Sequence, residues 1–297
     1  MNHEHLKTFV TVANHKSFSE AARILFLSQP TITSQIKSLE RSLNTSLFNR
    51  TSKYVEMTPA AKILYSYAQE ILDLQVKAQN EIDELLEDLH GKLIVASSLT
   101  IGEHLLPMFL YDFKKKYPKV DLSTDITNSQ HIVDMVKSDE LEIGLIEAAL
   151  DDPLLHVVPF MSDELVLVAY RDFFSSDRQE VKLTELRSLP IVLRERGSGT
   201  RTVAHQHLGE HDVHPDSLNV VLELGSTESV KTAVEAGLGV SILSKSAIRK
   251  ELDAGLFKTY PIENVELKRS FYVVYKKKKT LSLISQKFTS LILEKND

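Results

Sequence analysis

Residues 17–43 read SFSEAARILFLSQPTITSQIKSLERSL, and this stretch decides the fold of the amino-terminal region. Ser19 is a candidate N-cap for a short helix over residues 20–25. Ser28 is a candidate N-cap for a longer helix that tolerates Pro30 in its first turn. Upstream, apolar residues at helical spacing indicate one more helix: Leu6, Phe9, Val10 and Ala13. Three short helices with a tight break between the second and the third predict a helix-turn-helix.

The third of these helices has two faces of opposite character. Its apolar face, which we expect to be buried, consists of Ile32, Ile36, Leu39 and Leu43. Its other face is small, hydroxyl-rich and basic, whereas an ordinary solvated face would usually include Glu or Asp. Short side chains let a helix enter the major groove, hydroxyls and amides reach base edges, and cations meet phosphates. The candidate DNA-binding residues here are Ser28, Gln29, Pro30, Thr31, Thr33, Ser34 and Lys37.

A wing is predicted directly after the third helix. Residues 47–50 and 55–58 can pair as two short strands around residues 51–53, which places Arg50 and Lys53 beside the DNA backbone. The charge distribution agrees with this interpretation. Residues 1–58 carry seven Lys or Arg against four Asp or Glu, a balance of +3, whereas the whole chain carries −6 and the rest therefore −9. A basic head on an acidic body suits a head that docks on phosphates.

These segments together resemble the LysR-type transcriptional regulators. The resemblance is carried by residues 18–22 (FSEAA), 27–33 (LSQPTIT), 36–40 (IKSLE), 47–50 (LFNR) and 57–60 (MTPA). It implies a winged helix-turn-helix over 1–58 whose face from Gln29 to Lys37 contacts bases. Ser34 departs from the pattern, because many members carry Arg or another long polar side chain there, and this changes the expected base preference. Ala61 stands where Gly is common, without an expected consequence.

Residues 59–90 are predicted to form a long linker helix. Between Pro59 and Leu89 the chain has no further Pro and no Gly. An apolar stripe repeats every three or four residues through Leu64, Ala68, Ile71, Gln75, Ala78, Ile82, Leu85 and Leu89. Such a heptad seam favours a partner helix, although it could also pack on its own domain. The resemblance implies an antiparallel dimer of linker helices, with Gln75 as a polar register residue, and a homotetramer built through the carboxy-terminal domains.

Residues 91–297 are predicted to form an α/β effector-binding domain. Strand-like runs (93–96, 165–169, 190–193, 220–224 and 271–275) alternate with helical stretches, which favours largely parallel sheets. One such helix presents an apolar face and stops before Tyr117 and Pro118; the residues of this face are Leu106, Phe109, Leu110 and Phe113. We expect two lobes, lobe I over 92–161 and 268–297 and lobe II over 162–267. The resemblance implies the bilobal arrangement of type 2 periplasmic binding proteins.

Four segments are predicted to face one crevice between the lobes: 97–102, 128–130, 197–201 and 226–228. Each places hydroxyls and free backbone N–H groups after a strand, where open α/β sheets bind ligands. Helix amino termini attract anions, so a small anionic effector is expected, with Arg194, Arg196 and Arg201 adding charge. A plain structural N-cap is the alternative for each segment. The candidate effector-binding residues are Ser98, Thr100, Ile101, Ser129, Glu147, Ser198, Gly199, Thr200 and Thr227.

Glu147 has two opposed interpretations at the end of a predicted strand. It would accept a hydrogen bond from an amine-bearing ligand, and it would repel a dianion. Residues 194–201 (RERGSGTR), supported by 105–107 and 236–240, resemble the branch of the family that includes the CysL- and CbbR-like regulators of sulfur and carbon assimilation. This similarity suggests a metabolic anion such as sulfite, a sulfur intermediate or a small phosphorylated sugar.

Other classes of function fit less well. An enzyme is disfavoured because the glycines at 197–199 and 237–239 complete neither GxGxxG nor a Walker A motif, and GxSxG and HExxH are absent. Four histidines between His205 and His214 raise metal sensing, but no Cys completes a site, so no metal and no cofactor are expected. A transported-solute receptor would have a signal peptide. We expect a cytoplasmic protein without membrane contact that binds double-stranded promoter DNA and a small effector, with RNA polymerase as a candidate partner.

Overall fold

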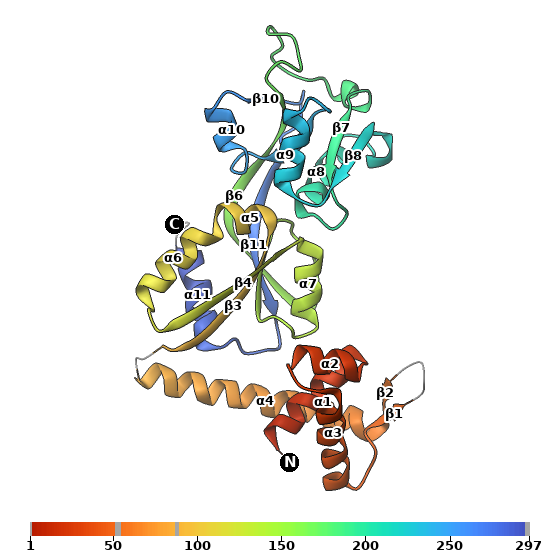
Figure 1. Cartoon of the computed structure of the whole chain (residues 1–297), viewed down its shortest axis with the longest axis vertical. Coiled ribbons are helices and arrows are strands. Elements are labelled where there is room, and N and C mark those ends of the chain that lie inside the picture. The colour runs from red at the N-terminus through yellow and green to blue at the C-terminus, as the bar shows by residue number, and fades with distance from the viewer. Residues whose placement is uncertain (1, 51–54, 87–88, 295–297) are drawn as a thin grey trace.

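The computed structural model describes residues 2–50, 55–86 and 89–294, which form a head, a long helix beside it and two lobes stacked end to end (Figure 1). The head contains α1 (His3–His15), α2 (Phe18–Ile24), α3 (Gln29–Leu43) and the hairpin of β1 (Phe48–Arg50) with β2 (Val55–Met57). The long helix is α4 (Pro59–Leu86). The predicted helix-turn-helix, its wing strands and the linker helix are all confirmed.

Polar N-caps begin each helix of the head. Ser28 caps α3 as predicted, since its Oγ accepts the Thr31 N–H at 3.2 Å. The prediction for α2 was wrong by two residues. Its N-cap is Ser17, which has an extended backbone (φ −150°) and accepts the Glu20 N–H at 3.1 Å. Ser19 lies inside the first turn, and only Ser17 has the three-residue spacing that lets an N-cap hydroxyl reach the third helical N–H.

The two parts of the linker helix have different surroundings. Its first part belongs to the head, because Leu64 and Ala68 are buried with α1 and α3 in one apolar core. For these two residues the seam prediction was wrong, and packing on their own domain is what occurs. Further along, the helix exposes large apolar side chains: Ile71, Leu74, Ile82 and Leu85. Gln75 is exposed beside this stripe, and residues 87–88 of the predicted helix lie outside the described residues.

Lobe I is built on parallel strands. Strand β3 (Gly91–Ser98) pairs in parallel with β4 (Val120–Thr127) on one side and β5 (Ile143–Ile146) on the other. Its helices are α5 (Leu99–His104), α6 (Leu106–Lys116), α7 (Ser129–Lys137) and α11 (Leu283–Glu294). Three residues of the predicted helix face, Leu106, Phe109 and Phe113, are buried in the core of this lobe. The fourth, Leu110, is half-buried beside them.

Lobe II has a smaller parallel pair of β7 (Ile191–Arg194) with β8 (Val220–Leu224). Its remaining strands are β9 (Ser241–Ser244) and β10 (Phe257–Tyr260), and its helices are α8 (Gly199–Gly209), α9 (Thr227–Glu235), α10 (Arg249–Asp253) and the 3-10 turns Leu183–Arg187 and Pro215–Ser217. Separate apolar clusters fill this lobe, so each lobe has its own core.

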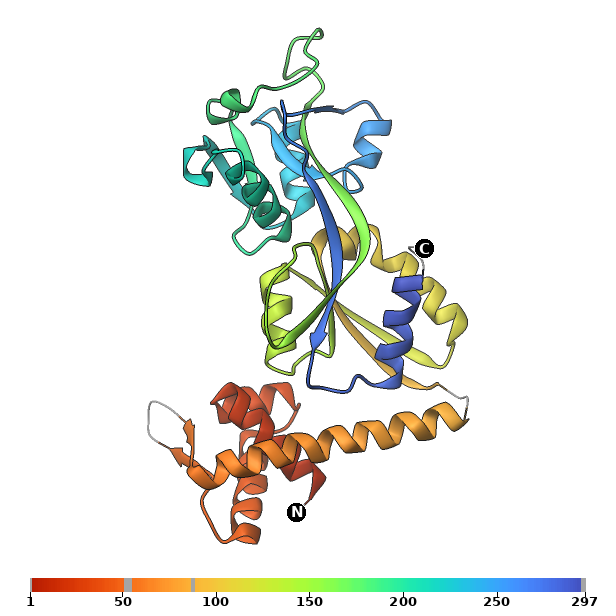
Figure 2. The same ribbon diagram turned by 180° about the vertical axis from the view of Figure 1, so that it is seen from behind.

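Two long strands join the lobes. Strands β6 (Leu155–Tyr170) and β11 (Lys268–Lys276) run antiparallel to each other through both lobes (Figure 2). The prediction of largely parallel sheets was therefore wrong for this part. The chain crosses from lobe I to lobe II along β6 and returns along β11, so the two crossing strands must oppose each other, and β5, β9 and β10 pair antiparallel with them. Among the described helices, none is long and apolar enough to cross a membrane.

Candidate functional site

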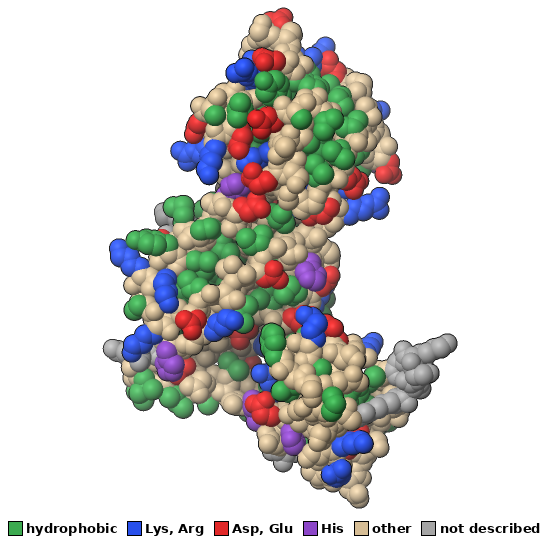
Figure 3. All heavy atoms as spheres, in the orientation of Figure 1, with side chains coloured by type: hydrophobic (Ala, Val, Ile, Leu, Met, Phe, Trp, Pro, Cys, Tyr) green, Lys and Arg blue, Asp and Glu red, His purple; other side chains and the backbone are tan. Residues whose placement is uncertain are grey.

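The exposed face of α3 carries the predicted DNA-binding side chains. Ser28, Gln29, Pro30, Ser34 and Lys37 are exposed, while Thr31 and Thr33 are half-buried. Figure 3 shows Lys and Arg side chains at the end of the head over this helix. The buried face holds Ile32, Ile36 and Leu39 in the head core, and Leu43 is half-buried beside them. The helix is thus fixed by its apolar side and offers its polar side to a partner.

Two contacts of the helix orient its first turn. The Ser28 Oγ lies 2.8 Å from the Thr31 Oγ1 in addition to capping the helix. The Ser19 hydroxyl donates to the Gln29 Oε1 at 3.2 Å, so α2 positions the Gln29 amide. In the wing, Arg50 pairs with Val55 in the β1–β2 ladder. The side chain of Arg50 and the whole of Lys53 lie outside the described residues, so their DNA contacts stay a prediction.

A second set of predicted residues meets around Glu147, which follows β5. The Thr100 N–H donates to the Glu147 Oε1 at 3.2 Å, and the Thr200 hydroxyl donates to the Glu147 Oε2 at 2.6 Å. The Glu147 N–H donates to the Ser129 Oγ at 3.3 Å. Thr100 and Ser129 belong to lobe I and Thr200 to lobe II, so three of the four predicted segments converge on this carboxylate.

Gly199 sits in the tightest part of this meeting point. A Cβ on Gly199 would lie 2.6 Å from the Glu147 Cβ and 2.7 Å from the Ser129 Oγ. Glycine is therefore what lets the amino end of α8 approach lobe I closely. The Gln130 N–H donates to the Gly197 carbonyl oxygen at 3.3 Å, which ties the same two segments together by their backbones.

The central cation of this site is Arg269, which our reading of the sequence missed. Its Nη1 donates to the Glu147 Oε2 at 2.6 Å, and its Nε donates to the Asp163 Oδ2 at 2.7 Å. Asp163 lies on β6 and Arg269 on β11, so the pair stands on the crossing strands between the lobes. Asp163 also accepts hydrogen bonds from the Ser244 and Ser246 hydroxyls at 2.9 and 3.1 Å.

The charged groups of this network are buried, and their contacts with one another keep them ionised. Glu147 and Arg269 are 1% and 7% exposed. Burial alone would raise the pKa of Glu147, but the charge of Arg269 and the surrounding hydroxyls outweigh it and hold the pKa at about 2. Glu147 is therefore a carboxylate at neutral pH that is already paired, and it is not a free acceptor for an amine.

Two buried donors at this site have no hydrogen-bond partner among the described residues. They are the hydroxyl of Ser198 and the Nη2 of Arg269. These two residues are 2% and 7% exposed. They come from the amino end of α8 and from β11, two of the segments that meet at Glu147. Buried polar groups are nearly always hydrogen-bonded, so these donors need a water or a ligand.

The remaining predicted residues lie apart from this centre. Ile101 is fully buried in the core of lobe I, among apolar side chains. Thr227 accepts a hydrogen bond from the Arg194 Nη1 at 2.9 Å, and Arg194 also binds Glu195 with two nitrogens. Arg201 is paired with Glu223. Arg194 and Arg201 are thus already paired with carboxylates, and Arg196 is exposed. The buried cation at the centre of the site is Arg269, which is also paired with carboxylates.

The predicted histidine cluster does not gather its ring nitrogens. His207 Nε2 lies 2.8 Å from the Lys268 carbonyl oxygen, and His211 Nδ1 lies 3.0 Å from the His207 carbonyl oxygen. The metal-ligating side chains that do meet among the described residues are Glu103, His104 and Glu228, within 4.8 Å. There the Lys231 ammonium already binds Glu228 at 2.8 Å.

Two family models match the chain over nearly its whole length. Residues 3–62 match the bacterial regulatory helix-turn-helix protein, lysR family, and residues 86–297 match the LysR substrate binding domain. The chain is 35% identical over 275 residues to the HTH-type transcriptional regulator CysL of Bacillus subtilis, covering 93% of this chain and 91% of CysL. It is 33% identical over 285 residues to a probable RuBisCO transcriptional regulator of Chlorokybus atmophyticus, covering 95% and 91%.

One solved structure is related over the effector-binding domain. The regulatory domain of CcmR from Synechocystis PCC6803, solved in complex with 2-PG, is 29% identical with a TM-score of 0.64, and the match covers 70% of this chain and 98% of that domain. CysL and the RuBisCO regulator confirm the branch that residues 194–201 predict.

The ionised network predicts an acid-sensitive domain. Because the pKa of Glu147 is about 2 in the folded chain against 4.5 ordinarily, its stabilisation is complete above pH 4.5 and is lost as the pH falls toward 2. Glu147→Gln should cost about 1.5–3 kcal/mol at pH 7, the contribution of a charge-assisted hydrogen bond, because Asp163 remains as a counter-charge for Arg269. The difference between variant and parent should shrink below pH 4.5. Urea unfolding followed by circular dichroism across this range measures both effects.

The matched control is Glu164→Gln, which removes an exposed carboxylate of β6 that is paired with Lys245 on the surface. Exposed pairs contribute about 0–1 kcal/mol, so this variant should unfold like the parent at every pH. Equal stability of the two variants at pH 7 would contradict a structural role for the Arg269–Glu147 pair.

Proposed function

The chain belongs to the LysR family of DNA-binding transcriptional regulators, and on that basis we propose that a small anion held between its two lobes modulates its binding to promoter DNA. Its relatives are named as transcriptional regulators, so the chain is a regulator and not an enzyme. Promoter DNA binds the α3 face and the wing, and the effector binds the crevice at Glu147. Because its target is promoter DNA, the proposed place of action is the cytoplasm.

The observation that carries the proposal is the set of unpartnered donors beside a buried guanidinium. The Ser198 hydroxyl and the Arg269 Nη2 can both donate, and neither has an acceptor among the described residues. Ser198 also precedes α8, whose amino terminus favours negative charge. Donors from both lobes aimed at one place fit an acceptor-rich ligand such as a carboxylate or a phosphate. The CcmR regulatory domain, a relative, was solved with 2-PG bound.

The residues suggest how such a ligand would act. An anion that pairs with Arg269 takes over the guanidinium that Glu147 now holds at 2.6 Å. Releasing Glu147 would also loosen its hydrogen bonds to Thr100 and Thr200, one in each lobe. The ligand thereby changes how the lobes close. Its effect on DNA binding is limited to its differential affinity for the two arrangements, commonly about 1–3 kcal/mol.

Calorimetry with 2-PG, sulfite and inorganic phosphate tests this site. We expect at least one of these probes to bind the full chain. Ser198→Ala should lower the affinity for that probe by about ten- to a hundredfold, because a hydrogen bond to a charged group contributes about 1.5–3 kcal/mol. Ser188→Ala, on an exposed part of lobe II, is the control and should bind like the parent. Equal affinities of these two variants would place the ligand elsewhere.

DNA recognition through α3 gives a second prediction. Gln29→Ala or Thr33→Ala should relax the preference for the operator over unrelated DNA, at about 1–3 kcal/mol for a lost base contact. Lys37→Ala should instead lower the affinity for all DNA sequences alike. It should also reduce the slope of log affinity against log salt concentration by about one unit. Titrations of labelled duplexes at several salt concentrations separate the two effects. If Gln29→Ala and Lys37→Ala behave identically, α3 is not the reading helix.

The proposed assembly is a homodimer through the exposed stripe of α4, and a homotetramer through the effector-binding domains. Ile71 and Ile82 are 41% and 52% exposed in the single chain, so a partner helix would bury them. Ile71→Glu with Ile82→Glu should leave the fold intact but abolish the dimer, because two carboxylates would face an apolar partner. The sedimentation coefficient should fall to that of a monomer, and the affinity for promoter DNA should fall with it.

The control for added charge is Ser66→Glu with Gln79→Glu, which places two carboxylates at exposed polar positions of the same helix. This pair should sediment like the parent. A dimer that survives Ile71→Glu with Ile82→Glu would show that another surface holds the protomers together.

A further inference from the structure

The head touches lobe I through one turn, the three residues after α7. His15 Nε2 lies 3.1 Å from the Ser138 carbonyl oxygen. The Asn14 amide donates to the Asp139 Oδ2 at 2.8 Å, and Arg23 lies 3.2 Å from the Glu140 Oε2. Three consecutive residues of lobe I thus each hold a different residue of the head. The position of the DNA-binding head depends on this turn.

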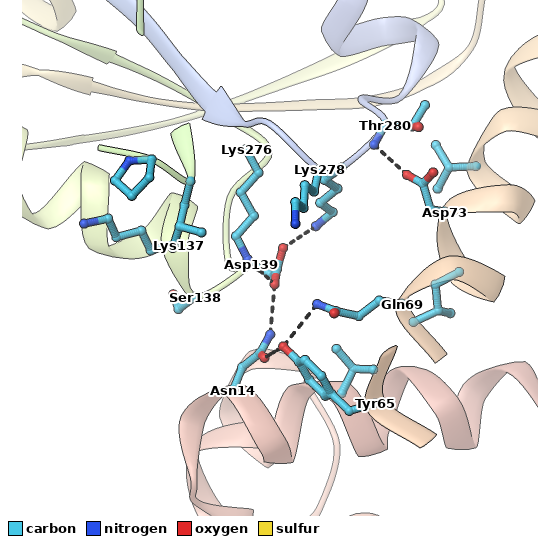
Figure 4. A pocket seen from close by; sticks show the side chains of 16 residues that line it. Asn14, Tyr65, Gln69, Asp73, Lys137, Ser138, Asp139, Lys276, Lys278 and Thr280 are labelled. Carbon is cyan, nitrogen blue, oxygen red and sulfur yellow. Dashed lines mark hydrogen bonds and ion pairs between the residues drawn. The ribbon is translucent and has the colours of Figure 1, made fainter. Parts of the chain in front are cut away.

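Asp139 is the half-buried centre of the junction (Figure 4). It receives the Lys276 ammonium at 2.5 Å and the Lys279 ammonium at 2.9 Å. Burial alone would raise the pKa of Asp139, but these two lysines outweigh it and hold the pKa below its ordinary value. Its backbone is left-handed, with φ +66°, as suits the residue that ends a helix. Asp139 is therefore ionised, and its charge is already neutralised by lysines of its own lobe.

A cavity of about 450 Å³ lies beside Asp139, between the head, the linker helix and lobe I (Figure 4). On the side of the head and linker its walls are mainly apolar, with Val10, Leu72 and Val76. On the side of lobe I it is lined by Lys137, Lys276, Lys278 and Lys279. Small-molecule sites commonly have about 300–1,000 Å³, an apolar lining and a few convergent polar groups. The cavity has all three features.

The four lysines that line the cavity carry two more positive charges than the two carboxylates that bind them, Asp139 and Asp152, can neutralise. Lys276 and Lys279 bind Asp139, and Lys137 binds Asp152. Asp73, the other carboxylate of the lining, is taken by Lys77 and by the Thr280 N–H at 2.6 Å. In the part of the chain that the structure describes, nothing pairs with Lys278. The cavity therefore combines an apolar wall with one unpaired ammonium.

We propose that this junction cavity is a second small-molecule site, and that its ligand is an amphipathic monoanion with an apolar body and one acidic group. The body lies against Val10, Leu72 and Val76, and the acid pairs with Lys278. Because the walls come from the head, the linker helix and lobe I, the ligand binds best when the head is docked. It therefore acts on the head directly, and it does so without the crevice at Glu147.

Calorimetry on the full chain with octanoate and 1-octanol tests the proposal. These probes share an apolar body and differ in the acidic group. We expect octanoate to bind more tightly than 1-octanol. Lys278→Ala should lower the affinity for octanoate at least tenfold and leave the affinity for 1-octanol unchanged. Lys277→Ala is the matched control, because Lys277 is the next lysine along the chain but does not line the cavity.

A second variant tests the location. Val76→Trp should fill the cavity and abolish binding of both probes, while circular dichroism confirms that the chain is folded. Absence of octanoate binding to the parent chain, or equal affinities of Lys278→Ala and Lys277→Ala, would overturn the proposal. The test is separate from that of the crevice: Ser198→Ala should bind octanoate like the parent, and Lys278→Ala should keep the response to the crevice probes.

Discussion

The closure of the two lobes depends on one buried ion pair, Arg269 with Glu147. Removing two ions from water costs several kcal/mol each, and only close contacts with good geometry offset that cost. Here the guanidinium reaches Glu147 at 2.6 Å and Asp163 at 2.7 Å, while the carboxylate also accepts from the Thr100 N–H and the Thr200 hydroxyl. Because the partners come from lobe I, lobe II and both crossing strands, the lobes cannot separate without exposing or unpairing a charge.

The same pair restricts the chemistry of an effector. Arg269 brings one positive charge to the crevice, whereas Glu147 and Asp163 bring two negative ones, so an arriving anion meets a centre that is negative overall. Protonation does not relieve this at neutral pH, since the pKa of Glu147 is about 2. An anion that takes the Nη1 of Arg269 must therefore displace the Glu147 carboxylate, whereas the Nη2 has no partner among the described residues. Glu147 directly follows β5, a strand fully buried in the sheet of lobe I, so the displacement is passed to the backbone of that lobe.

The sequence predicts best where one local pattern is sufficient. The N-cap Ser28 and the stripe of Ile32, Ile36 and Leu39 define α3 without any distant contact, and the structure has both. The effector crevice was predictable only in part, because strand-end hydroxyls are local signals. Arg269 gave no such signal: it follows Lys268 in a polar run, and it is buried only because β11 returns beside β6. Leu64 and Ala68 match a heptad seam, yet they are buried in the core of the head. A periodic apolar stripe predicts that its residues are covered, but not which neighbour covers them.

The docked position of the head rests on weak contacts, and this makes it a suitable point of control. Arg23 and Glu140 are 64% and 22% exposed in their side chains, and such surface pairs contribute only about 0–1 kcal/mol. The His15 contact is a single hydrogen bond, with a net contribution of about 0.5–1.5 kcal/mol. Only the Asn14–Asp139 bond involves a charged group that is half-buried and held by two lysines. A coupling of about 1–3 kcal/mol, the usual size of an allosteric effect, is therefore comparable to the energy that holds the head. A ligand need not unfold or rebuild any part of the chain to redirect α3, because a small shift in the equilibrium between the docked and the undocked head is sufficient.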